Sequence, residues 1–389
     1  MTPEARIDTA ALLLDQILAG TSAEKALTAW ARRSRFAGSK DRAAIRDHVF
    51  EALRCKRSFA ALGGALNGRG LMVGLLRAAG VDPQTVFTGQ GHAPSVLSPQ
   101  ELARGQQPDA AEAWDLPDWL IARFQDSLGD QAFDVSQVSR HRAPVMLRVN
   151  LRKSTVAQAI EILARDGVRA QVTQMSPTAL LVTEGPRRIN ASEAYRTGLV
   201  ELQDGASQAV VDMLPLRDGM RVLDYCAGGG GKTLAMAGRA QAAFFAHDVN
   251  MRRLKDLPQR SERAGVSVKL LDRNELQGKA HFDLVLCDAP CSGSGAWRRS
   301  PEGKWDLTPE RLQELTGIQA SILEEAHPLV SEGGTLAYAT CSVLAEENMA
   351  QITRFLGRHP EWSLTCAQHW LPGTEGDGFY AACLTRRVK

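Results

Sequence analysis

The sequence predicts an α/β protein whose C-terminal half is built on a parallel β-sheet. Three apolar runs, at 220–223, 282–287 and 335–339, each end in a loop that carries glycine, acid or cysteine residues. Stretches with helical periodicity separate these runs, and such alternation is typical of a parallel sheet covered on both faces. The length of 389 residues exceeds one ordinary domain, so we expect smaller domains before this one.

The first 135 residues are predicted to form an all-helical domain. Apolar residues recur at helical spacing over 4–19 and 22–34, and Gly20 closes the first of these helices. Ser39 is a suitable N-cap for a helix over 41–58, and Pro117 is suited to start another over 118–128. The stretch 80–110 is rich in Gly, Pro, Gln and Ser and is expected to be irregular.

A small α+β domain is predicted over 136–205, with strands at 145–150, 168–174 and 179–183 and a helix at 156–166. The third domain, 206–389, alternates strands and helices. Its strands are expected at 220–225, 243–248, 267–271, 282–287, 334–340 and 378–385, and its helices at 233–240, 251–264, 309–330 and 345–357. Ligands of such sheets bind at the carboxyl ends of the strands.

Composition excludes several classes of protein. No apolar run approaches the roughly 20 residues of a membrane span, and the early acids Glu4 and Asp8 argue against a targeting peptide. The seven cysteines are scattered and odd in number, which favours a reducing compartment over a disulfide framework. We therefore expect a cytoplasmic protein, monomeric, with no membrane partner.

Positive charge is concentrated between residues 32 and 57. Nine cationic residues there face three acids, Asp41, Asp47 and Glu51. Such a patch can pair with the phosphates of a nucleic acid, although a solvated helix face has the same composition. The cations are Arg32, Arg33, Arg35, Lys40, Arg42, Arg46, Arg54, Lys56 and Arg57.

A glycine loop, Asp224-Tyr-Cys-Ala-Gly-Gly-Gly-Gly-Lys-Thr233, follows the first strand of the predicted sheet. It fails the phosphate-binding P-loop pattern because Cys226 stands where the first glycine is required, and it also fails the dinucleotide pattern. Acids end the next two strands: Asp248 is placed to hold ribose hydroxyls, and Asp272 to accept from an adenine amine. Acidic side chains at the strand ends, with no phosphate-binding motif beside them, favour a cationic cofactor that lacks phosphate. S-adenosylmethionine meets that description.

Two cysteines lie in loops that follow strands, in Asp288-Ala-Pro-Cys291 and in Thr340-Cys341. Together with the glycine loop they indicate covalent chemistry on an electron-poor carbon, with a cofactor that delivers a group to the adduct. The alternative is two packed cysteines in small-residue turns. No metal site is expected, because Cys287 and Cys291 have no histidine close by in the sequence.

These motifs resemble the Nop/Sun family of RNA cytosine-5 methyltransferases. The resemblance rests on Asp-x-Cys-Ala-x-x-Gly-Gly-Lys-Thr, Asp-Ala-Pro-Cys-Ser-Gly-x-Gly and Thr-Cys-Ser followed by Glu-Glu-Asn, and extends to Leu147-Arg-Val-Asn150, Gln203-Asp204 and Gly376-Asp-Gly-Phe379. It covers roughly residues 140–389. The run Arg35-Phe-Ala-Gly-Ser-Lys-Asp-Arg42 also resembles the RNA-binding, antitermination-factor-like domain that the family's bacterial ribosomal members carry.

The resemblance implies a Rossmann-like class I methyltransferase domain after a ferredoxin- or RRM-like domain and a helical RNA-binding domain. It implies a nucleophilic Cys341, a product-release role for Cys291, and a structured RNA substrate, with ribosomal RNA expected. Asp288, paired with Lys232, would neutralise charge on the ring. The residues implied to hold S-adenosylmethionine are Cys226, Ala227, Gly228, Gly229, Gly230, Gly231, Lys232, Asp248, Asp272 and Asp288.

One departure from the family pattern is Gly229, which stands where the family usually has proline. The absence of the proline is expected to weaken cofactor ordering by about 0.5–1 kcal/mol. Two alternative functions stay open: a DNA cytosine methyltransferase that uses Cys291 as nucleophile, and an RNA-binding assembly factor with a vestigial cofactor site. A further expectation is that Arg298, Arg299 and Lys304, near Trp297 and Trp305, hold phosphates and stack bases.

Overall fold

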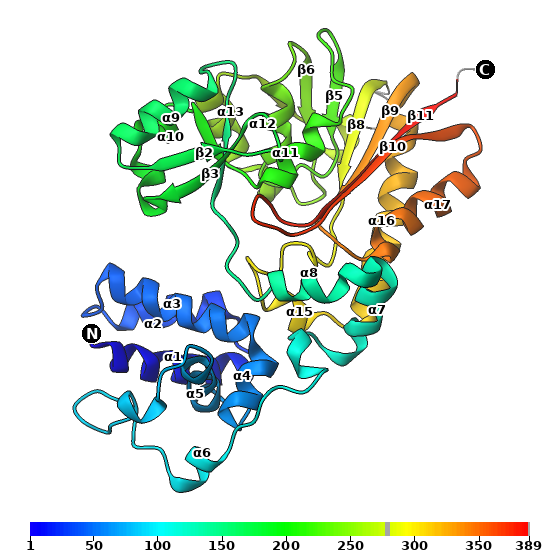
Figure 1. The fold of residues 1–389 in the computed structure, drawn as a ribbon. Helices are drawn as coiled ribbons and strands as arrows, with labels where there is room; N and C mark the ends of the chain where they lie inside the picture. The colour runs from blue at the N-terminus through cyan, green and yellow to red at the C-terminus, as the bar shows by residue number, and fades with distance from the viewer. Residues whose placement is uncertain (277–280, 388–389) are drawn as a thin grey trace. The chain divides into compact units, whose positions relative to one another are not determined.

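A computed structural model describes residues 1–276 and 281–387 of the chain (Figure 1). Its contacts form two compact units. The first comprises Met1–Arg142 together with Trp297–Asp306, and the second comprises Ala143–Ala296 with Leu307–Lys389. The described residues have the predicted fold class: helices, a small sheet, and a larger sheet rich in parallel pairs.

The first unit is helical. Its core is formed by α1, α2, α3 and α5 around buried residues such as Leu14, Ile45 and Leu71. The amphipathic spacing that predicted these helices therefore corresponds to one apolar core. The helices are α1 (Pro3–Leu18), α2 (Ala23–Arg33), α3 (Ser39–Arg54), α4 (Lys56–Gly63), α5 (Gly68–Ala78), α6 (Pro99–Ala103), α7 (Asp118–Leu128), α8 (Ala132–Val138) and α15 (Gly303–Asp306), with 3-10 turns at Pro83–Thr85, Glu112–Trp114 and Gly129–Gln131.

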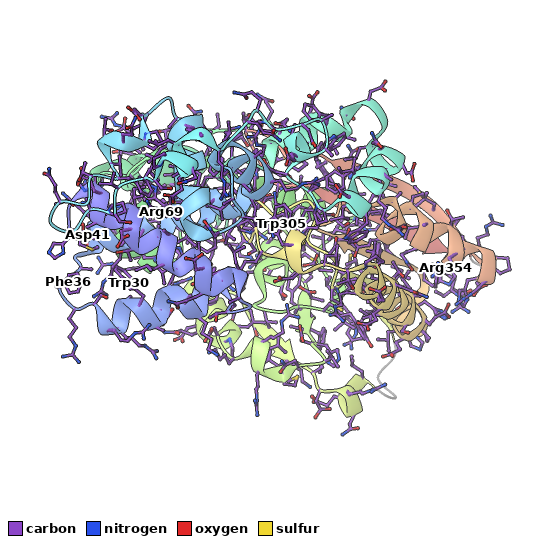
Figure 2. All side chains as sticks on the ribbon, turned by 90° about the horizontal axis from the view of Figure 1, so that it is seen from below. Trp30, Phe36, Asp41, Arg69, Trp305 and Arg354 are labelled. Atoms are coloured by element: carbon purple, nitrogen blue, oxygen red, sulfur yellow. The ribbon has the colours of Figure 1, made fainter. Side chains whose placement is uncertain are left out.

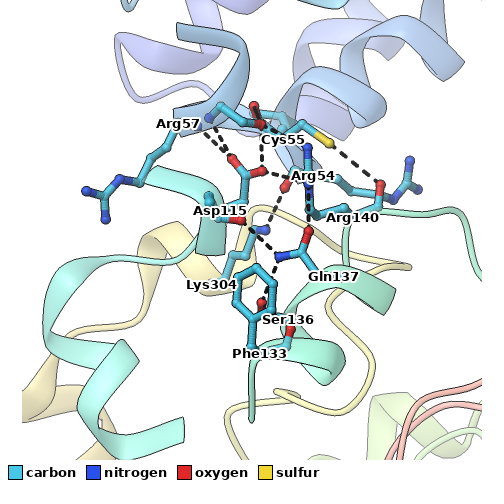
Figure 3. Close-up of polar contacts among 12 residues, drawn as sticks. Arg54, Cys55, Arg57, Asp115, Phe133, Ser136, Gln137, Arg140 and Lys304 are labelled. Carbon is cyan, nitrogen blue, oxygen red and sulfur yellow. Dashed lines mark hydrogen bonds and ion pairs between the residues drawn. The ribbon is translucent and has the colours of Figure 1, made fainter. Parts of the chain in front are cut away.

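The helix predicted over 41–58 is broken at Cys55 into α3 and α4. Asp115, which is fully buried, accepts hydrogen bonds from the backbone N–H groups of Arg57 and Ser58, both at 2.9 Å, and forms an ion pair with Arg140 (Figure 3). A carboxylate at the first turn satisfies free N–H groups and complements the helix dipole. The break is therefore fixed by a residue distant in sequence.

The segment Trp297–Asp306 packs against the helical unit, contrary to its predicted role in binding RNA. Lys304 is 1% exposed and donates to the carbonyl oxygen of Arg54 at 2.7 Å (Figure 3). Burial lowers its pKa to about 8. Trp297 is buried in a stack with Phe124, and the indole N–H of Trp305 donates to the carbonyl of Leu53. Lys304 and Trp297 are thus packing residues, Arg298 is also buried, and Arg299 is exposed.

The second unit begins with a four-stranded antiparallel sheet in the order β2-β3-β1-β4. Leu147, Leu163 and Leu180 lie in the core between this sheet and α9. Asn150, at the end of β1, donates to the carbonyls of Gly198 and Ala264 and so ties the sheet to a helix of the larger domain. The elements are β1 (Met146–Val149), α9 (Val156–Arg165), β2 (Arg169–Val172), β3 (Ala179–Glu184), a 3-10 turn (Pro186–Ala191), α10 (Glu193–Arg196) and β4 (Val200–Leu202).

The larger sheet has seven strands in the order β10-β11-β9-β8-β5-β6-β7. The pairs among β5 to β9 are parallel, whereas β11 pairs antiparallel with both β9 and β10. The strands are β5 (Arg221–Asp224), β6 (Ala243–Ala246), β7 (Val268–Leu270), β8 (Phe282–Asp288), β9 (Val330–Thr340), β10 (Trp362–Trp370) and β11 (Phe379–Arg386). The helical elements are α11 (Gly205–Asp212), α12 (Gly231–Ala237), a 3-10 turn (Met251–Leu254), α13 (Leu257–Ala264), α14 (Arg273–Leu276), α16 (Pro309–Ala326), 3-10 turns at His327–Leu329 and Ala345–Glu347, and α17 (Met349–Arg358).

Helices cover both faces of this sheet (Figure 1). Alternate residues of the central strands face opposite ways: Leu223 and Val285 share an apolar cluster with residues of α16 and α17, and Leu284 shares one with residues of α11 and α12. After β7 the chain returns to β8 on the other side of β5, so strand order reverses between β5 and β8. That reversal is where parallel sheets place their ligands.

In the described part of the chain, no single helix is long and apolar enough to cross a membrane. One helix pair, α4 and α5, passes that test of length and composition, but it is bent by 90°.

Candidate functional site

The predicted site residues gather at the carboxyl edge of the large sheet. Asp224 ends β5, Asp288 ends β8, and Cys341 directly follows β9, and these three strands are neighbours in the sheet. The two motifs that contain the cysteines are thus adjacent through the pairing of β8 with β9. The helix expected from residue 345 begins only at Met349, after a 3-10 turn, so Cys341 does not lie at a helix N-terminus.

The glycine loop turns sharply between β5 and α12. Gly228 and Gly230 have φ angles of +54° and +77°, which side chains other than glycine rarely adopt. Gly229 stands where the family usually has proline, and a hydrogen bond holds it in place of the proline ring. Its carbonyl accepts from the guanidinium of Arg260, which also pairs with Glu201. Arg148, from β1, donates to the carbonyl of Gly231 at 2.9 Å. Two arginines thus fix a loop that has no proline.

Asp224 is a buried acid beside this loop. One carboxylate oxygen accepts from the hydroxyl of Thr233 at 2.6 Å, and Oδ1 has no hydrogen-bond partner among the described residues. Burial raises the pKa of Asp224 to about 7. A positively charged ligand near the loop would reverse part of that shift, so the site fits a cationic cofactor.

A cavity of about 800 Å³ opens beside the glycine loop. Of the residues predicted to hold a cofactor, Cys226 and Asp248 line it. Asp248 is buried, and its carboxylate accepts from the N–H of Gly228 at 2.9 Å and pairs with Arg253 at 3.2 Å. The lining also includes the apolar side chains of Val249, Met251, Ile318 and Ile322 and the charged side chains of Arg253, Arg273, Glu314 and Glu325, and the volume suits a nucleoside cofactor.

Asp272 and the other residues predicted to bind the cofactor, apart from Cys226 and Asp248, do not line this cavity. Asp272 accepts from the N–H of Glu275 at 2.9 Å and so caps the short helix α14, and its neighbour Arg273 lines the cavity instead. The backbone of Ala227–Gly231 and the side chain of Asp288 are also not among the lining residues. Because Asp272 does not line the cavity, its predicted role in binding adenine has no support from the shape of the cavity.

The predicted pair of Lys232 and Asp288 is present, with 2.7 Å between Lys232 Nζ and Asp288 Oδ2. Burial lowers the pKa of Lys232, but attraction to Asp288, with a smaller contribution from Cys341, more than offsets it, so the pKa is raised. The ammonium also lies over the ring of Phe379 at 4.8 Å. Lys232 therefore supplies a fixed positive charge close to both a carboxylate and a thiol.

The sulfur atoms of Cys291 and Cys341 are 3.4 Å apart. Contact with Cys341 and burial both raise the pKa of Cys291 well above its ordinary value. Cys291 is therefore held as a neutral thiol that can donate its proton toward Cys341. The alternative of two packed cysteines in small-residue turns is compatible with the same contact, so formation of a covalent adduct decides between the two interpretations.

Glu347 joins the loops of the two cysteines, and the sequence reasoning gave it no role. It is completely buried, and its carboxylate accepts from the N–H and hydroxyl of Ser292 at 2.8 and 2.5 Å and from the hydroxyl of Ser342 at 2.5 Å. Gln319 of α16 donates to the same group at 3.0 Å. Ser292 and Ser342 each follow one of the cysteines, so a single carboxylate fixes the spacing of the two thiols.

A second contact holds the Cys291 loop from the side of β11. A Cβ atom on Gly295 would lie 2.2 Å from the carbonyl oxygen of Gly378, so only glycine fits there. The N–H of Asp377 donates to both carboxylate oxygens of Asp204 at 3.1 Å. The Gln-Asp and Gly-Asp-Gly-Phe motifs thus serve as supports of the Cys291 loop.

We expect Asp248→Ala to weaken binding of S-adenosylmethionine by about 1–3 kcal/mol, roughly 5- to 150-fold, because the substitution removes both a charged hydrogen-bond acceptor and the anchor of Gly228. Calorimetry on the purified protein measures this. Asp272→Ala, a matched acid that caps α14, should leave the affinity within about twofold. Binding of ATP or NAD more tightly than S-adenosylmethionine would contradict the assignment of the cavity.

Comparison with known proteins gives consistent matches. Residues 211–385 match the family model described as 16S rRNA methyltransferase RsmB/F, and residues 116–189 match the ferredoxin-like domain of RsmF/B-like methyltransferases. Ribosomal RNA small subunit methyltransferase B of Cronobacter sakazakii is 35% identical over 288 residues, which cover 70% of this chain and 67% of the relative. The protein of the same name from Citrobacter koseri is 37% identical over 285 residues, covering 70% and 66%.

Among solved structures, the crystal structure of PH0851 superposes with a TM-score of 0.78 at 26% identity, covering 99% of each chain. A methyltransferase homologue from Pyrococcus horikoshii superposes with a TM-score of 0.63 at 24% identity, which shows likeness of fold alone. The chain spans about two thirds of the length of the curated relatives that it matches.

Proposed function

Because the chain belongs to the RsmB/F family of 16S rRNA methyltransferases, we propose that it methylates carbon 5 of a cytidine in structured, ribosomal RNA through a covalent adduct on Cys341. The observation that carries this proposal is the 3.4 Å contact between Cys291 and Cys341 beside the Lys232–Asp288 pair. Methylation of ribosomal RNA but not of DNA of the same sequence, with 5-methylcytidine as the product nucleoside, tests it.

The cofactor is S-adenosylmethionine, which supplies an electrophilic methyl group. Cys226 and Asp248 would hold it in the cavity, with Asp248 toward its ribose. Asp224, beside the glycine loop, would complement its positive charge, whereas Asp248 already pairs with Arg253.

The thiolate of Cys341 adds to carbon 6 of the cytosine, which converts carbon 5 into an enamine-like nucleophile. Lys232 and Asp288, which pair at 2.7 Å, would offset the charge that develops on ring nitrogen 3 and the exocyclic amine. After carbon 5 has taken the methyl group, a base removes the proton from carbon 5. The electron pair of that C–H bond re-forms the double bond between carbons 5 and 6, and the bond between carbon 6 and the Cys341 sulfur breaks, so that the sulfur leaves as a thiolate.

Cys291 would assist this final step. Its thiol touches Cys341, so it would stabilise the departing thiolate by a hydrogen bond. Contact with Cys341 and burial favour the neutral form of Cys291, which suits a hydrogen-bond donor to the departing sulfur. The target base must be unstacked for the thiol to reach its ring face.

RNA recognition is proposed for the turn between α2 and α3. Arg32 and Arg33 at the end of α2, Arg35 in the turn and Arg42 near the start of α3 are exposed, and Arg42 also donates to the carbonyl of Ala37 at 2.9 Å. Phe36, at the rim of the helical unit, is 76% exposed (Figure 2). Cations around an exposed aromatic ring can bind phosphates and stack a base. Other members of the predicted patch are already engaged: Arg46 pairs with Glu24, Arg57 with Asp118, and Arg54 is buried.

We expect replacement of Arg32, Arg33, Arg35 and Arg42 by Gln to raise the KM for RNA and to flatten the salt dependence of RNA binding, with kcat retained. For each arginine that pairs with a phosphate, its removal should reduce the slope of log K against log salt by about 0.7–0.9. Filter binding over a salt series measures it. Arg46→Gln is the matched control, since Glu24 already neutralises that arginine, and equal slopes for parent and the fourfold variant would exclude the patch from RNA binding.

A further inference from the structure

The C-terminal ends of α16 and α17 meet in a cluster of two imidazoles and a carboxylate. Glu324 lies in the last turn of α16, His327 follows three residues later, and His359 directly follows α17. Glu324 Oε2 lies 2.8 Å from His359 Nε2 and 3.9 Å from His327 Nε2. The three side chains can offer ligand atoms that all lie within 4.8 Å of one another.

These separations are compatible with a tetrahedral metal ion. Zinc binds imidazole nitrogen and carboxylate oxygen at about 2.0–2.2 Å, so neighbouring ligand atoms of a tetrahedral site stand roughly 3.3–3.5 Å apart. The 2.8 Å separation is shorter and the 3.9 Å separation is longer than this value, so the side chains must shift to enclose an ion. Two imidazoles with one carboxylate form a ligand set that zinc uses with water at the fourth position.

The surroundings support the rings as ligands. The His359 ring packs against Phe355 and His327, with centroids 4.5 and 4.4 Å apart, so neither imidazole is a loose surface side chain. Glu361 Oε1 lies 3.6 Å from His359 Nδ1, which is too far for a hydrogen bond but adds negative charge beside the cluster. Both histidines follow helix C-termini, whose free carbonyls favour a cation.

One cation competes for the cluster. The guanidinium of Arg358 lies 3.4 Å from Glu324 Oε1, but its side chain is 59% exposed and can turn into solvent. Without a metal ion, the same side chains form a hydrogen-bonded cap shared by two helix ends. The hydrogen bond between His359 and Glu324 then occupies the ligand positions of both groups.

We propose that Glu324, His327 and His359 bind one divalent transition-metal ion of the zinc type, which joins the ends of α16 and α17. The role is structural: α16 carries Gln319, which contacts Glu347, and α17 begins directly after the Glu347–Asn348 turn. The ion therefore stabilises the frame around the cysteine loops and does not enter the methyl transfer.

The test is a zinc titration of chelator-treated protein in competition with a chromophoric chelator, with the melting temperature recorded alongside. We expect one zinc ion per chain and a rise in melting temperature, because an ion bound only by the folded state stabilises it. His327→Ala and His359→Ala should each weaken binding by more than about tenfold, whereas Arg358→Gln should strengthen it by removing the competing charge. His92→Ala, at an exposed histidine of the helical unit, should bind like the parent.

Two results would overturn the proposal. Equal zinc affinity in His359→Ala and parent would place the ion on thiols or other surface groups. The absence of stoichiometric uptake by both the parent and Arg358→Gln would leave the cluster as a helix cap only. Neither outcome bears on the methyl transfer, because the site does not include the cysteines.

Discussion

Cys341→Ala should abolish methylation and form no covalent complex with RNA. Without this sulfur nothing adds to carbon 6, and carbon 5 of an unactivated cytosine does not attack the methyl group. A decrease of at least about 10⁴-fold in rate is expected for removal of a covalent nucleophile. Transfer of labelled methyl groups to RNA measures activity, and denaturing gel electrophoresis detects the adduct.

Cys291→Ala should fail in the opposite way. Cys341 still attacks and the methyl group is still transferred, but release is impaired because the thiol that touches the departing sulfur is missing. A protein–RNA species should accumulate that survives denaturation, with its link at Cys341. The variant that lacks both cysteines should show no such species, because an adduct that never forms cannot be trapped.

The pattern of bands separates the alternatives. A stable complex from Cys341→Ala, with none from Cys291→Ala, would make Cys291 the nucleophile, as in DNA cytosine methyltransferases. Retained activity in both variants would exclude covalent catalysis. RNA binding without methyl transfer by the unaltered protein would favour an assembly factor with a vestigial cofactor site.

Glu347→Gln should lower kcat by about 10- to 100-fold while affinity for S-adenosylmethionine stays unchanged. The amide has one acceptor oxygen in place of two, so it cannot accept together from Ser292, Ser342 and Gln319. The spacing of the two sulfurs would then relax, and misplacement by about 1 Å can cost 10²-fold in rate. Single-turnover kinetics and calorimetry measure the two quantities.

Adduct trapping distinguishes positioning from general destabilisation. In the Cys291→Ala background, Glu347→Gln should slow formation of the trapped complex, whereas Glu332→Gln, an exposed glutamate at the start of β9, should not. A melting temperature lowered by Glu347→Gln, with an unchanged rate of adduct formation, would limit this residue to a role in stability.

The arrangement of the site was predictable because it depends on strand ends. Asp224, Asp288 and Cys341 each follow a short apolar run, and residues after parallel strands meet at one edge of a sheet. The ion pair of Lys232 with Asp288 follows from the same reasoning. The antiparallel strand β10 was missed although Trp362, Leu364 and Cys366 alternate with Ser363 and Thr365, because it lies at the edge of the sheet, most of its residues are at least partly exposed and it has no long apolar run.

Contacts between distant segments were not predictable from local patterns. The end of α3 at Arg54 depends on Asp115, which caps the following helix and carries no local signal for a break. Lys304 has the local pattern of a surface cation, but the structure buries it against the carbonyl of Arg54. Glu347 shows the same limit, since only the folded chain shows that it joins two loops. Asp272 differs, because its cap is local: Asp272 and Glu275, three residues apart, bond to each other's backbone N–H groups, a pattern that is readable in the sequence.

Bisulfite sequencing of total RNA tests the central claim most directly. It compares a strain that carries this gene, a strain that lacks it, and deletion strains complemented with the parent gene or with Cys341→Ala. We predict one protected cytidine in small-subunit ribosomal RNA that disappears on deletion, returns with the parent gene and does not return with Cys341→Ala. Full protection in the deletion strain, or restoration by Cys341→Ala, would contradict cytosine-5 methylation through Cys341.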